Sequence, residues 1–485
     1  MSNVALQTVT PAFSNDIMDI VRVFLHGATL VYEGESEIFL RHTEETQENH
    51  VLVTILIHGA KTVIAKETYT PNDDPLLHKR FQKRAIKLAV YSGLKELTGH
   101  TPPWGALTGI RPTAIVRRLV KEGLSLPNAC QKAKETYDIT EEKTALLQEI
   151  MTTQQALPLP KAHQVDVYVG TPFCVSRCAY CSFLSGEIGK GKDVAPYVQS
   201  LLKEIQAAKT LIAQKNLEID TVYIGGGTPT ALPAHLLQLV LQAVAPLAKG
   251  KEFTVEAGRP DTIDLEKLTM IKEFGANRIS INPQTVHDKT LRKIGRAHTH
   301  QQTIEAYEMA RSLEFSHINM DLIAGLPGED EAMFAETLQF AKAMRPESLT
   351  VHTLCIKRSS LLNLWQSSLP DGDRVQTMVR MGYDVAKELH MPAYYLYRQK
   401  NMAGNLENVG YATPGHACRY NINMMEELGN VLALGAGGIS KRVYDMQGKI
   451  KRAPNVSNIQ EYINRTDEMI ERKYTLWTGE EAPLH

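Results

Sequence analysis

Three closely spaced cysteines are the residues of this sequence best suited to chemistry. Cys174, Cys178 and Cys181 lie in YVGTPFCVSRCAYC with C-x3-C-x2-C spacing. Soft thiolates at such spacing suit zinc or an iron–sulfur cluster, but structural zinc normally takes four ligands, and no fourth cysteine or histidine follows at finger spacing. Three thiolates on a [4Fe–4S] cluster leave one iron open, as reductive cleavage of S-adenosylmethionine requires. A zinc knuckle and three unrelated core thiols are the alternatives.

Further candidate residues stand at the ends of apolar runs that are typical of β-strands. The glycine run GGGTPT follows TVYI, and glycines let a backbone approach a ligand closely. An arginine could bind a ligand carboxylate, and an aspartate could accept hydrogen bonds from ribose hydroxyls. The candidate ligand-binding residues are Gly226, Gly227, Thr228, Glu256, Gln284, Arg296 and Asp321.

The segment that carries these residues, 161–355, alternates short β-branched runs with amphipathic stretches. The runs are DVYVG, TVYIGGG, FTVEAG, RISINPQ, HINMDLIAGLP and SLTVHTL. This alternation indicates an α/β fold with a parallel sheet, and six units predict a partial (β/α)6 barrel. Functional residues of parallel barrels gather at the carboxyl ends of the strands, so we expect the candidates to share one cavity.

Two flanking regions complete the predicted organisation. Residues 1–160 are predicted as an N-terminal α+β domain, with strand-like alternation in IVRVFLHGATLVYEG, EIFLRH and HVLVTILIHG and helical periodicity from Pro75. No motif assigns this domain a role. Residues 356–485 are predicted as a mostly helical region that covers the substrate.

The composition restricts the class of protein. The 485 residues are 22% charged with a net charge of −1, so bulk charge predicts no attraction to nucleic acid or a membrane, which leaves room for a local basic pocket. No apolar run is long enough to predict a membrane span, and the N-terminus lacks the pattern of a secretion signal. With the remaining cysteines scattered, a cytoplasmic location is expected.

The motifs taken together resemble a known family. The cysteine motif followed by GGGTP is similar to the radical S-adenosylmethionine (radical SAM) superfamily. Within it, YVGTPFC, GGGTPT, NRISINPQ and DLIAGLP resemble the oxygen-independent coproporphyrinogen III oxidases. The segments LTGIRPT, HTLCIKRSS, YRQKNMAGNLENVGY and LGAGGISKR narrow the resemblance to HemZ-type coproporphyrinogen dehydrogenases and extend it over most of the chain.

This resemblance implies cofactors, site residues and a reaction. The cofactors would be a [4Fe–4S] cluster on the three cysteines and S-adenosylmethionine. Tyr168 matches the family tyrosine beside the sulfonium and is the expected catalytic residue. The implied reaction is oxidative decarboxylation of two coproporphyrinogen III propionates to vinyl groups, giving protoporphyrinogen IX in haem biosynthesis, with a flavodoxin or ferredoxin as reductant. The other matched residues are Gly226, Gly227 and Thr228 for the methionine amino group, and Glu256, Gln284, Arg296 and Asp321 as further S-adenosylmethionine contacts.

Two departures from the family pattern keep other functions open. Phe183 stands where the best-known oxidases have a fourth cysteine, as it does in haem chaperones of the HemW type, and Gly170 stands where they usually have histidine. One alternative is a radical SAM protein that binds and delivers haem, with His416 as a possible ligand; another is an enzyme acting on a different tetrapyrrole. Candidate substrate contacts are His352, Lys357, Arg358, Arg398, Lys400, Asn401, Asn405 and Asn408.

Overall fold

The computed structural model describes residues 3–31, 36–181, 186–188, 193–356, 360–364, 370–400, 402–444 and 450–479. The chain forms two compact units: unit 1 is Met1–Gln148 with Gly404–Leu406, and unit 2 is Glu149–Ala403 with Glu407–His485. The division falls inside helix α5 (Glu141–Gln155) rather than at residue 160. The predicted regions 161–355 and 356–485 lie in one unit, because strands of the second region pair with strands of the first.

Unit 1 is an α+β unit. Its sheet has the order β2-β1-β3-β4-β5, with β1 parallel to both neighbours and β3, β4 and β5 antiparallel. Strand β4 (Val51–His58) alternates buried and half-buried residues, as expected for a sheet with one face on the core. The other strands are β1 (Asn3–Thr8), β2 (Thr29–Val31), β3 (Ile38–Thr46) and β5 (Thr62–Tyr69).

The predicted strand IVRVFLHGATLVYEG is wrong over its first half. Residues Ser14–Phe24 form helix α1, and among the described residues of that stretch only Thr29–Val31 form a strand. Ile17, Ile20 and Val21 are buried at helical spacing, so one helix face packs on the core. The predicted alternation was too short to distinguish the two periods.

The remaining helices of unit 1 follow its sheet in the sequence. Helix α2 (Pro75–Thr98) begins with the Asp74 side chain accepting a hydrogen bond from the Leu76 amide, and it ends at Gly99 with φ of +69°. Its predicted helical periodicity is confirmed, as are helices over the PTAIVRRLVKEGL and EEKTALLQEIMTTQQAL stretches. The shorter helices are α3 (Thr113–Lys121) and α4 (Leu126–Tyr137).

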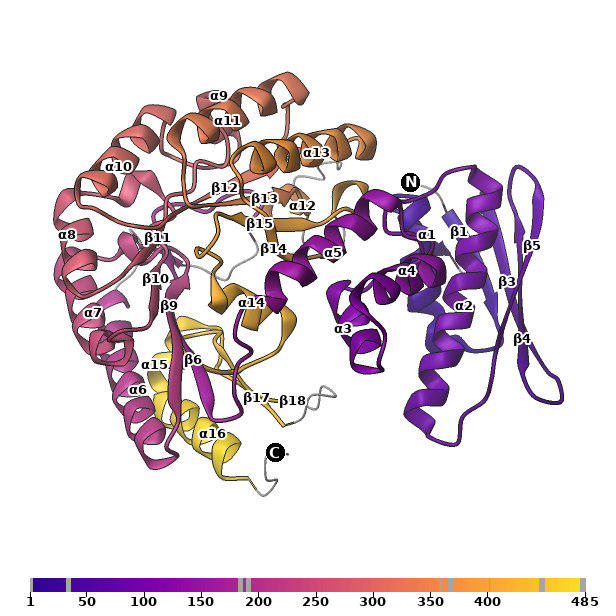
Figure 1. Ribbon diagram of the computed structural model, residues 1–485, viewed down its shortest axis with the longest axis horizontal. Helices are drawn as coiled ribbons and strands as arrows, with labels where there is room; N and C mark the ends of the chain where they lie inside the picture. The colour runs from indigo at the N-terminus through magenta and orange to yellow at the C-terminus, as the bar shows by residue number, and fades with distance from the viewer. Residues whose placement is uncertain are drawn as a thin grey trace. The chain divides into compact units, whose positions relative to one another are not determined.

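Unit 2 contains the predicted six parallel strands, each flanked by a helix that covers the outside of the sheet (Figure 1). Every apolar run named in the sequence forms its strand. These are β6 (Gln164–Thr171), β9 (Glu218–Gly226), β10 (Glu252–Val255), β11 (Arg278–Ser280), β12 (Ile318–Ala324) and β13 (Ser348–Thr353). The outer helices are α6 (Val194–Gln214), α7 (Ala234–Ala248), α8 (Leu265–Glu273), α9 (Asp288–Lys293), α10 (His300–Ser312) and α11 (Glu331–Met344).

The C-terminal region holds helices, as predicted, and also five strands that the prediction missed. Strand β16 pairs in parallel with β6, and β15 pairs antiparallel with β13, so both edges of the six-stranded part are extended. The helices are α12 (Leu361–Leu364), α13 (Gly372–Glu388), α14 (Arg419–Glu426), α15 (Ile459–Asn464) and α16 (Thr466–Thr478). The strands are β14 (Ala393–Tyr397), β15 (Asn408–Ala412), β16 (Asn430–Leu434), β17 (Ile439–Val443) and β18 (Ile450–Pro454).

A buried ion pair holds α16 to α6. Lys473 Nζ lies 2.6 Å from Glu204 Oε1, and both side chains are almost fully buried. Glu204 also accepts hydrogen bonds from the amide of Gly435 and the hydroxyl of Tyr462. The glycine loop after β16 is thereby tied to the helices that pack behind β6.

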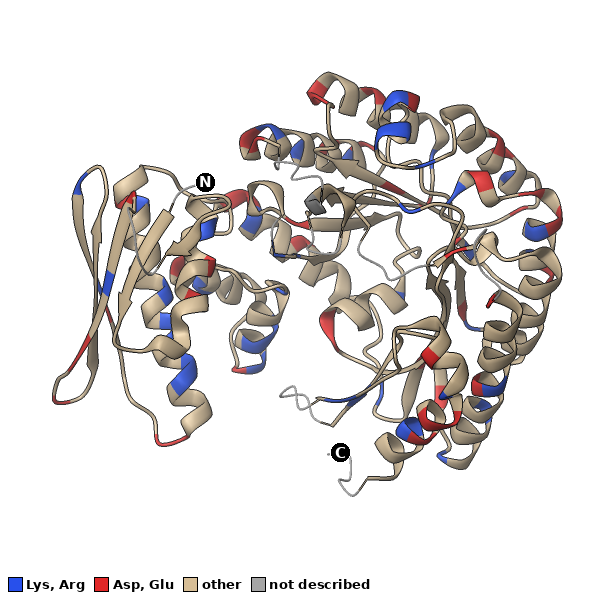
Figure 2. Ribbon diagram, turned by 180° about the vertical axis from the view of Figure 1, so that it is seen from behind, with Lys and Arg blue, Asp and Glu red and all other residues tan. Residues whose placement is uncertain are grey.

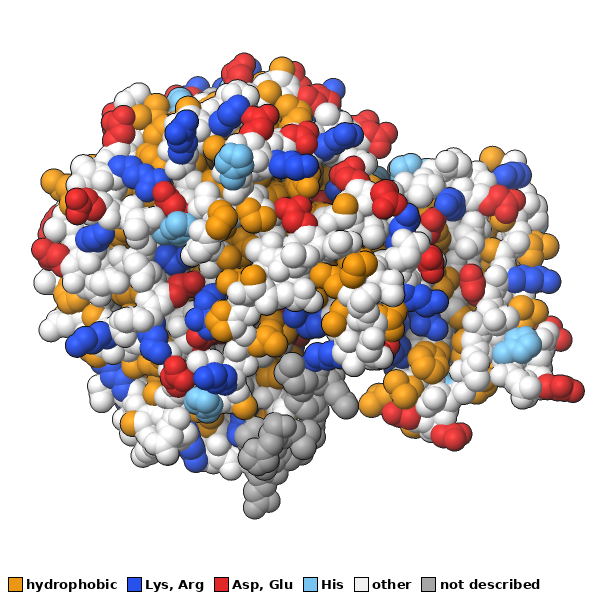
Figure 3. Space-filling view, in the orientation of Figure 1, with side chains coloured by type: hydrophobic (Ala, Val, Ile, Leu, Met, Phe, Trp, Pro, Cys, Tyr) orange, Lys and Arg blue, Asp and Glu red, His pale blue; other side chains and the backbone are white. Residues whose placement is uncertain are grey.

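The surface carries no strong separation of charge on the face shown in Figure 3, where acidic and basic side chains are interspersed. Within the described part of the chain, no helix is long and apolar enough to cross a membrane.

Candidate active site

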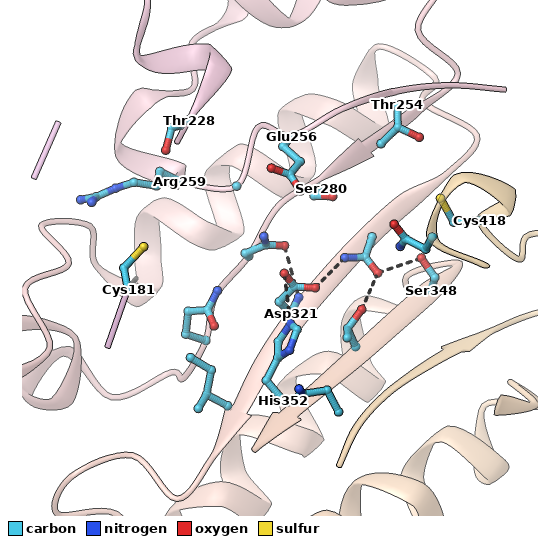
Figure 4. A pocket seen from close by; sticks show the side chains of 18 of the residues that line it. Cys181, Thr228, Thr254, Glu256, Arg259, Ser280, Asp321, Ser348, His352 and Cys418 are labelled. Carbon is cyan, nitrogen blue, oxygen red and sulfur yellow. Dashed lines mark hydrogen bonds and ion pairs between the residues drawn. The ribbon is translucent and has the colours of Figure 1, made fainter. Parts of the chain in front are cut away.

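One cavity of about 360 Å³ in unit 2 brings the sequence-predicted residues together. Figure 4 shows Cys181, Thr228 and Arg259 toward one end of this cavity and Ser348 and Cys418 toward the other. The predicted residues that line it are Cys174, Cys178, Cys181, Gly226, Gly227, Thr228, Glu256, Gln284, Arg296 and Asp321. The expectation that strand ends converge is met, with one difference: Asp321 lies in the middle of β12 rather than at its end.

The cysteine loop leaves β6 and is held by groups from three other parts of the barrel. Cys174 Sγ lies 3.5 Å from Thr228 Oγ1, after β9. Arg259, after β10, donates to the Ser176 carbonyl at 3.0 Å and reaches Cys178 Sγ at 3.8 Å. The Ala179 amide donates to the Ile294 carbonyl at 2.8 Å. The loop therefore has a defined position before any cofactor is considered.

The three thiols fit a [4Fe–4S] cluster better than a single metal ion. Among the described residues, no three histidine, cysteine or acidic side chains converge as ligands of one ion. The cysteines of a cubane each bind a different iron, so they need to face a common space without touching a common point. All three line the cavity and are partly exposed, and the Arg259 guanidinium lies beside Cys178.

The glycine run packs against the cysteine loop. A Cβ on Gly227 would lie 2.4 Å from the Phe173 carbonyl oxygen, and one on Gly225 would lie 2.8 Å from Glu256 Oε2. The Gly227 and Thr228 amides donate to the carbonyls of Thr171 and Phe173 at 2.8 and 2.7 Å. The glycines are required here for backbone–backbone packing, and this packing also brings Gly226 and Gly227 to the cavity wall.

The carboxyl group of Glu256 has a raised pKa. Burial, and then the nearby charge of Asp321, raise its pKa to about 7, although a hydrogen bond from the Tyr223 hydroxyl lowers it in part. At neutral pH this side chain can accept or donate a proton with little cost, so a ligand cation near it would favour its ionised form.

Asp321 titrates in the opposite direction from Glu256. Burial alone would raise its pKa, but hydrogen bonds from His352 and Asn319 outweigh burial and lower the pKa. His352 Nε2 lies 3.6 Å from one carboxylate oxygen, and Asn319 Nδ2 donates to the other at 2.8 Å. The surroundings therefore shift the pKa values of Glu256 and Asp321 in opposite directions, and Asp321 stays ionised.

Gln284 adopts a conformation that is uncommon for a residue with a side chain. Its φ is +65°, and it is buried. Its amide donates to the Asp321 carbonyl at 2.9 Å, and its carbonyl accepts from the Ile323 amide at 3.1 Å. Two hydrogen bonds to β12 hold this strained residue at the cavity wall, which is frequent at ligand sites.

The hydrogen bonds of Arg296 mainly connect different elements of the fold. It donates to the Gly258 carbonyl at 2.6 Å, the Asn282 carbonyl at 3.1 Å and the Tyr180 hydroxyl at 3.1 Å, and its Nε lies 3.3 Å from His298 Nδ1. These four contacts occupy most of the five N–H groups of an arginine. Arg296 therefore joins the cysteine loop to the ends of β10 and β11.

Tyr168 lies outside the cavity lining. Its ring stacks with Tyr223 and Tyr420 at centroid distances of 6.3 and 6.2 Å. Its hydroxyl is 3.2 Å from the position that a Cβ on Gly226 would take. Burial, and then the charge of Glu256, raise its pKa, so it stays protonated. Its position supports the strand end behind Gly226.

Sequence reasoning missed the polar rows inside the barrel. Neighbouring strands align Ser280 with Asn319, and Asn319 with Ser348, while Asp321 aligns with Thr350. Ser348 Oγ donates to Asn319 Oδ1 at 3.0 Å and lies 2.8 Å from a ring nitrogen of His317. The signal was present, because polar residues occupy every second position of RISINPQ, HINMDLI and SLTVHT and therefore one face of the sheet.

Most of the candidate substrate contacts fall outside this cavity or outside the described residues. His352 and Asn408 line it. Arg398 is buried away from the lining, where burial lowers its pKa to about 10. Asn405 belongs to unit 1. Residues Phe183, Lys357, Arg358 and Asn401 lie outside the described residues.

Comparisons with known proteins agree with this fold. Residues 168–341 match the model of the radical SAM superfamily. The chain is 36% identical over 474 residues, 94% of each chain, to the oxygen-independent coproporphyrinogen-III oxidase-like protein HemZ of Bacillus subtilis. It is 30% identical to the heme chaperone HemW of Escherichia coli over 60% of this chain and 74% of that one. The solved coproporphyrinogen III oxidase HemN from Escherichia coli superposes with a TM-score of 0.52 at 20% identity, covering 66% of this chain and 72% of that chain.

The fold and the cysteine site define a radical SAM protein. The chain belongs to this superfamily and, within it, to the HemZ-type group related to oxygen-independent coproporphyrinogen III oxidases. Its cofactors are accordingly a [4Fe–4S] cluster and S-adenosylmethionine.

Proposed function

We propose that the protein decarboxylates coproporphyrinogen III oxidatively, without oxygen, to form protoporphyrinogen IX. The observation that carries the proposal is the single cavity in which the three cysteines, the glycine strand end and the polar barrel interior meet. The likeness to the HemZ protein over 94% of both chains supports the choice of a tetrapyrrole.

The proposed roles follow from the chemistry of each side chain. Cys174, Cys178 and Cys181 would hold the cluster, and Thr228 and Arg259 would surround its thiolates. When bound, the cluster and S-adenosylmethionine supply a 5′-deoxyadenosyl radical. A hydrogen atom would pass from the β-carbon of a propionate to this radical, giving 5′-deoxyadenosine. The substrate radical would then lose CO2 and give one electron to a one-electron acceptor, which leaves a vinyl group.

The remaining predicted residues would orient S-adenosylmethionine. The Gly226–Thr228 backbone can accept hydrogen bonds from the methionine ammonium, and Glu256 can ionise beside that cation. Asp321, which stays ionised, can accept from ribose hydroxyls. Arg296 retains one N–H for the methionine carboxylate, and Gln284 offers its amide at the same wall. Tyr168 would act by supporting Gly226 from behind.

The test is an anaerobic incubation of the reconstituted protein with coproporphyrinogen III, S-adenosylmethionine and a low-potential reductant such as reduced flavodoxin. We expect vinyl-containing product and 5′-deoxyadenosine in matched amounts. The Cys178→Ala variant is the control and should form neither. Cleavage of S-adenosylmethionine without loss of CO2 from coproporphyrinogen would reject this substrate and favour another tetrapyrrole.

A haem chaperone is the second candidate. It is favoured by the relationship to the HemW protein and by Phe183, which stands where the best-known oxidases carry a cysteine. Tight stoichiometric haem binding, with transfer to an acceptor protein and no decarboxylation, would establish this function instead.

A further inference from the structure

A stripe of five cations runs along one side of helix α2 in unit 1. Lys79, Arg80, Lys83, Arg84 and Lys87 are spaced three and four residues apart, so they share one face of the helix. Figure 2 shows this concentration of basic residues on α2. Farther along the helix Ile86, Ala89 and Val90 are buried, and α2 packs against strands β4 and β5.

These cations border a groove with an apolar floor. The groove has a volume of about 410 Å³, within the usual range of small-molecule sites. We call it the cationic groove, and no acidic side chain is among the described residues that line it. Besides the five cations of α2, its lining includes Thr108 and Gly109, and the apolar part is formed by Leu76, Leu88, Ala106, Leu107 and Tyr137.

The positive charge of the groove is only partly balanced by the protein. Lys83 forms an ion pair with Asp16 at 3.3 Å, and Lys87 donates to the Thr108 hydroxyl. Lys79, Arg80 and Arg84 are exposed, and Arg84 interacts electrostatically with Glu67. Like charges three and four residues apart oppose helix formation, so this stripe weakens α2 unless an anion neutralises it. A requirement for anion binding would explain why the stripe is present.

We propose that the cationic groove binds a tetrapyrrole, with the ring on the apolar floor and the propionates on the cations of α2. This proposal rests on the proposed function, because that function supplies the ligand class: a flat apolar body with several carboxylates. Exposed lysines and arginines at the rim suit carboxylates that stay partly hydrated. A single-stranded nucleic acid is the less favourable occupant, since base stacking uses aromatic platforms and the groove offers only Tyr137 among its described residues.

The experiment titrates the full-length protein with coproporphyrin III, the stable oxidised ring, and counts sites by porphyrin fluorescence. The test variant is Lys79→Glu/Arg80→Glu. The matched control is Lys66→Glu/Lys132→Glu, which reverses two exposed cations of unit 1 outside the groove. Circular dichroism checks that both variants fold.

We expect the wild type and the control to bind a second equivalent of coproporphyrin III, beyond any bound in unit 2, with affinity that falls as salt is added. The test variant should bind that equivalent about tenfold more weakly or worse, because two charged contacts are replaced by repulsion. Coproporphyrin tetramethyl ester, which lacks the charges, should not occupy the site. Equal porphyrin binding by the two variants would overturn the proposal. Binding of single-stranded DNA to the groove that coproporphyrin III does not displace would also overturn it.

The same variants separate this proposal from the proposed function. Decarboxylation is measured at saturating coproporphyrinogen III, where loss of the groove should leave the rate unchanged. A protein that binds at the groove but forms no vinyl product would reject the enzymatic function and retain the site. A protein that decarboxylates normally while both variants bind alike would reject the groove alone.

Discussion

The cavity of unit 2 and the cationic groove of unit 1 differ in how far their charged side chains are exposed to water. The cavity is lined by half-buried carboxyl groups, such as Glu256 and Asp321, whose charge states are set by neighbouring side chains. Of the cations that line the groove, Lys79, Arg80 and Arg84 are exposed to water, whereas Lys83 and Lys87 are half-buried. Burial makes the cavity sensitive to single atoms and to pH, whereas exposure makes the groove sensitive to net charge and to salt.

The largest expected effect isolates the cavity from the groove. Cys178→Ala should abolish the visible absorbance of the cluster and all 5′-deoxyadenosine formation, because a cubane needs all three thiolates here. Coproporphyrin III binding at the groove should persist in this variant. Cys130→Ala, at a buried thiol of unit 1, is the control and should keep the cluster. Retained S-adenosylmethionine cleavage by Cys178→Ala would contradict the ligand assignment.

The second prediction compares a buried cation with an exposed one on the same helix pair. Lys473→Met leaves Glu204 buried without its ion partner and should lower the free energy of unfolding by about 3–5 kcal/mol. Lys203→Met removes the exposed pair with Asp467 and should cost no more than about 1 kcal/mol. Urea unfolding followed by circular dichroism measures both. Similar losses in the two variants would show that burial does not set the energy of this pair.

The third prediction uses pH to test the burial of Glu256. Its folded pKa of about 7 lies above the ordinary value of 4.5, so its ionisation opposes folding as pH rises between these values. Glu256→Gln removes this dependence. The stability of the variant relative to wild type should therefore increase by about 2–3 kcal/mol between pH 4.5 and about pH 7.5. Urea unfolding of the cluster-free proteins measures it, with the exposed Glu266→Gln as control; a constant difference would mean that Glu256 is well solvated.

The smallest expected effect concerns the cost of the cationic stripe. Arg80→Gln removes the repulsion of Arg80 by the like charges of Lys83 and Arg84. It should stabilise unit 1 by about 0.2–0.5 kcal/mol for each of these two pairs. The gain should vanish in high salt, and Lys66→Gln on strand β5 should show none. Thermal unfolding at two salt concentrations measures it. A loss of stability in Arg80→Gln would indicate an internal role for this arginine.

Much of the barrel could be predicted because its signals are local. Each strand of unit 2 is a short β-branched run followed by a helical stretch, and a parallel sheet brings the strand ends together. Helix α1 was mistaken for a strand because IVRVF fits both periods over five residues. The five C-terminal strands were missed because β15 and β16 are defined by pairing with β13 and β6, which lie far away in the sequence.

The candidate site likewise contains residues that the sequence identified and residues that it did not. The cysteines, the glycine run and the carboxyls of Glu256 and Asp321 were identified from residue type and spacing, and they line one cavity. Arg259 was not identified, because nothing in the sequence segment GRPD indicates that its side chain reaches Cys178. Arg296 was chosen for a ligand carboxylate, yet its nearest acceptors are the carbonyls of Gly258 and Asn282.

The sequence by itself identified the three cysteines as candidate ligands and determined the parallel α/β order and the family, since cysteine spacing and hydrophobic period are properties of neighbouring residues. Only the tertiary structure decided what each polar group does. Tyr168 came to lie behind Gly226, Glu256 and Asp321 acquired opposite pKa shifts, and the α2 cations came to border an apolar floor. These properties depend on burial and on distances between residues remote in the chain, which are determined only when the elements pack.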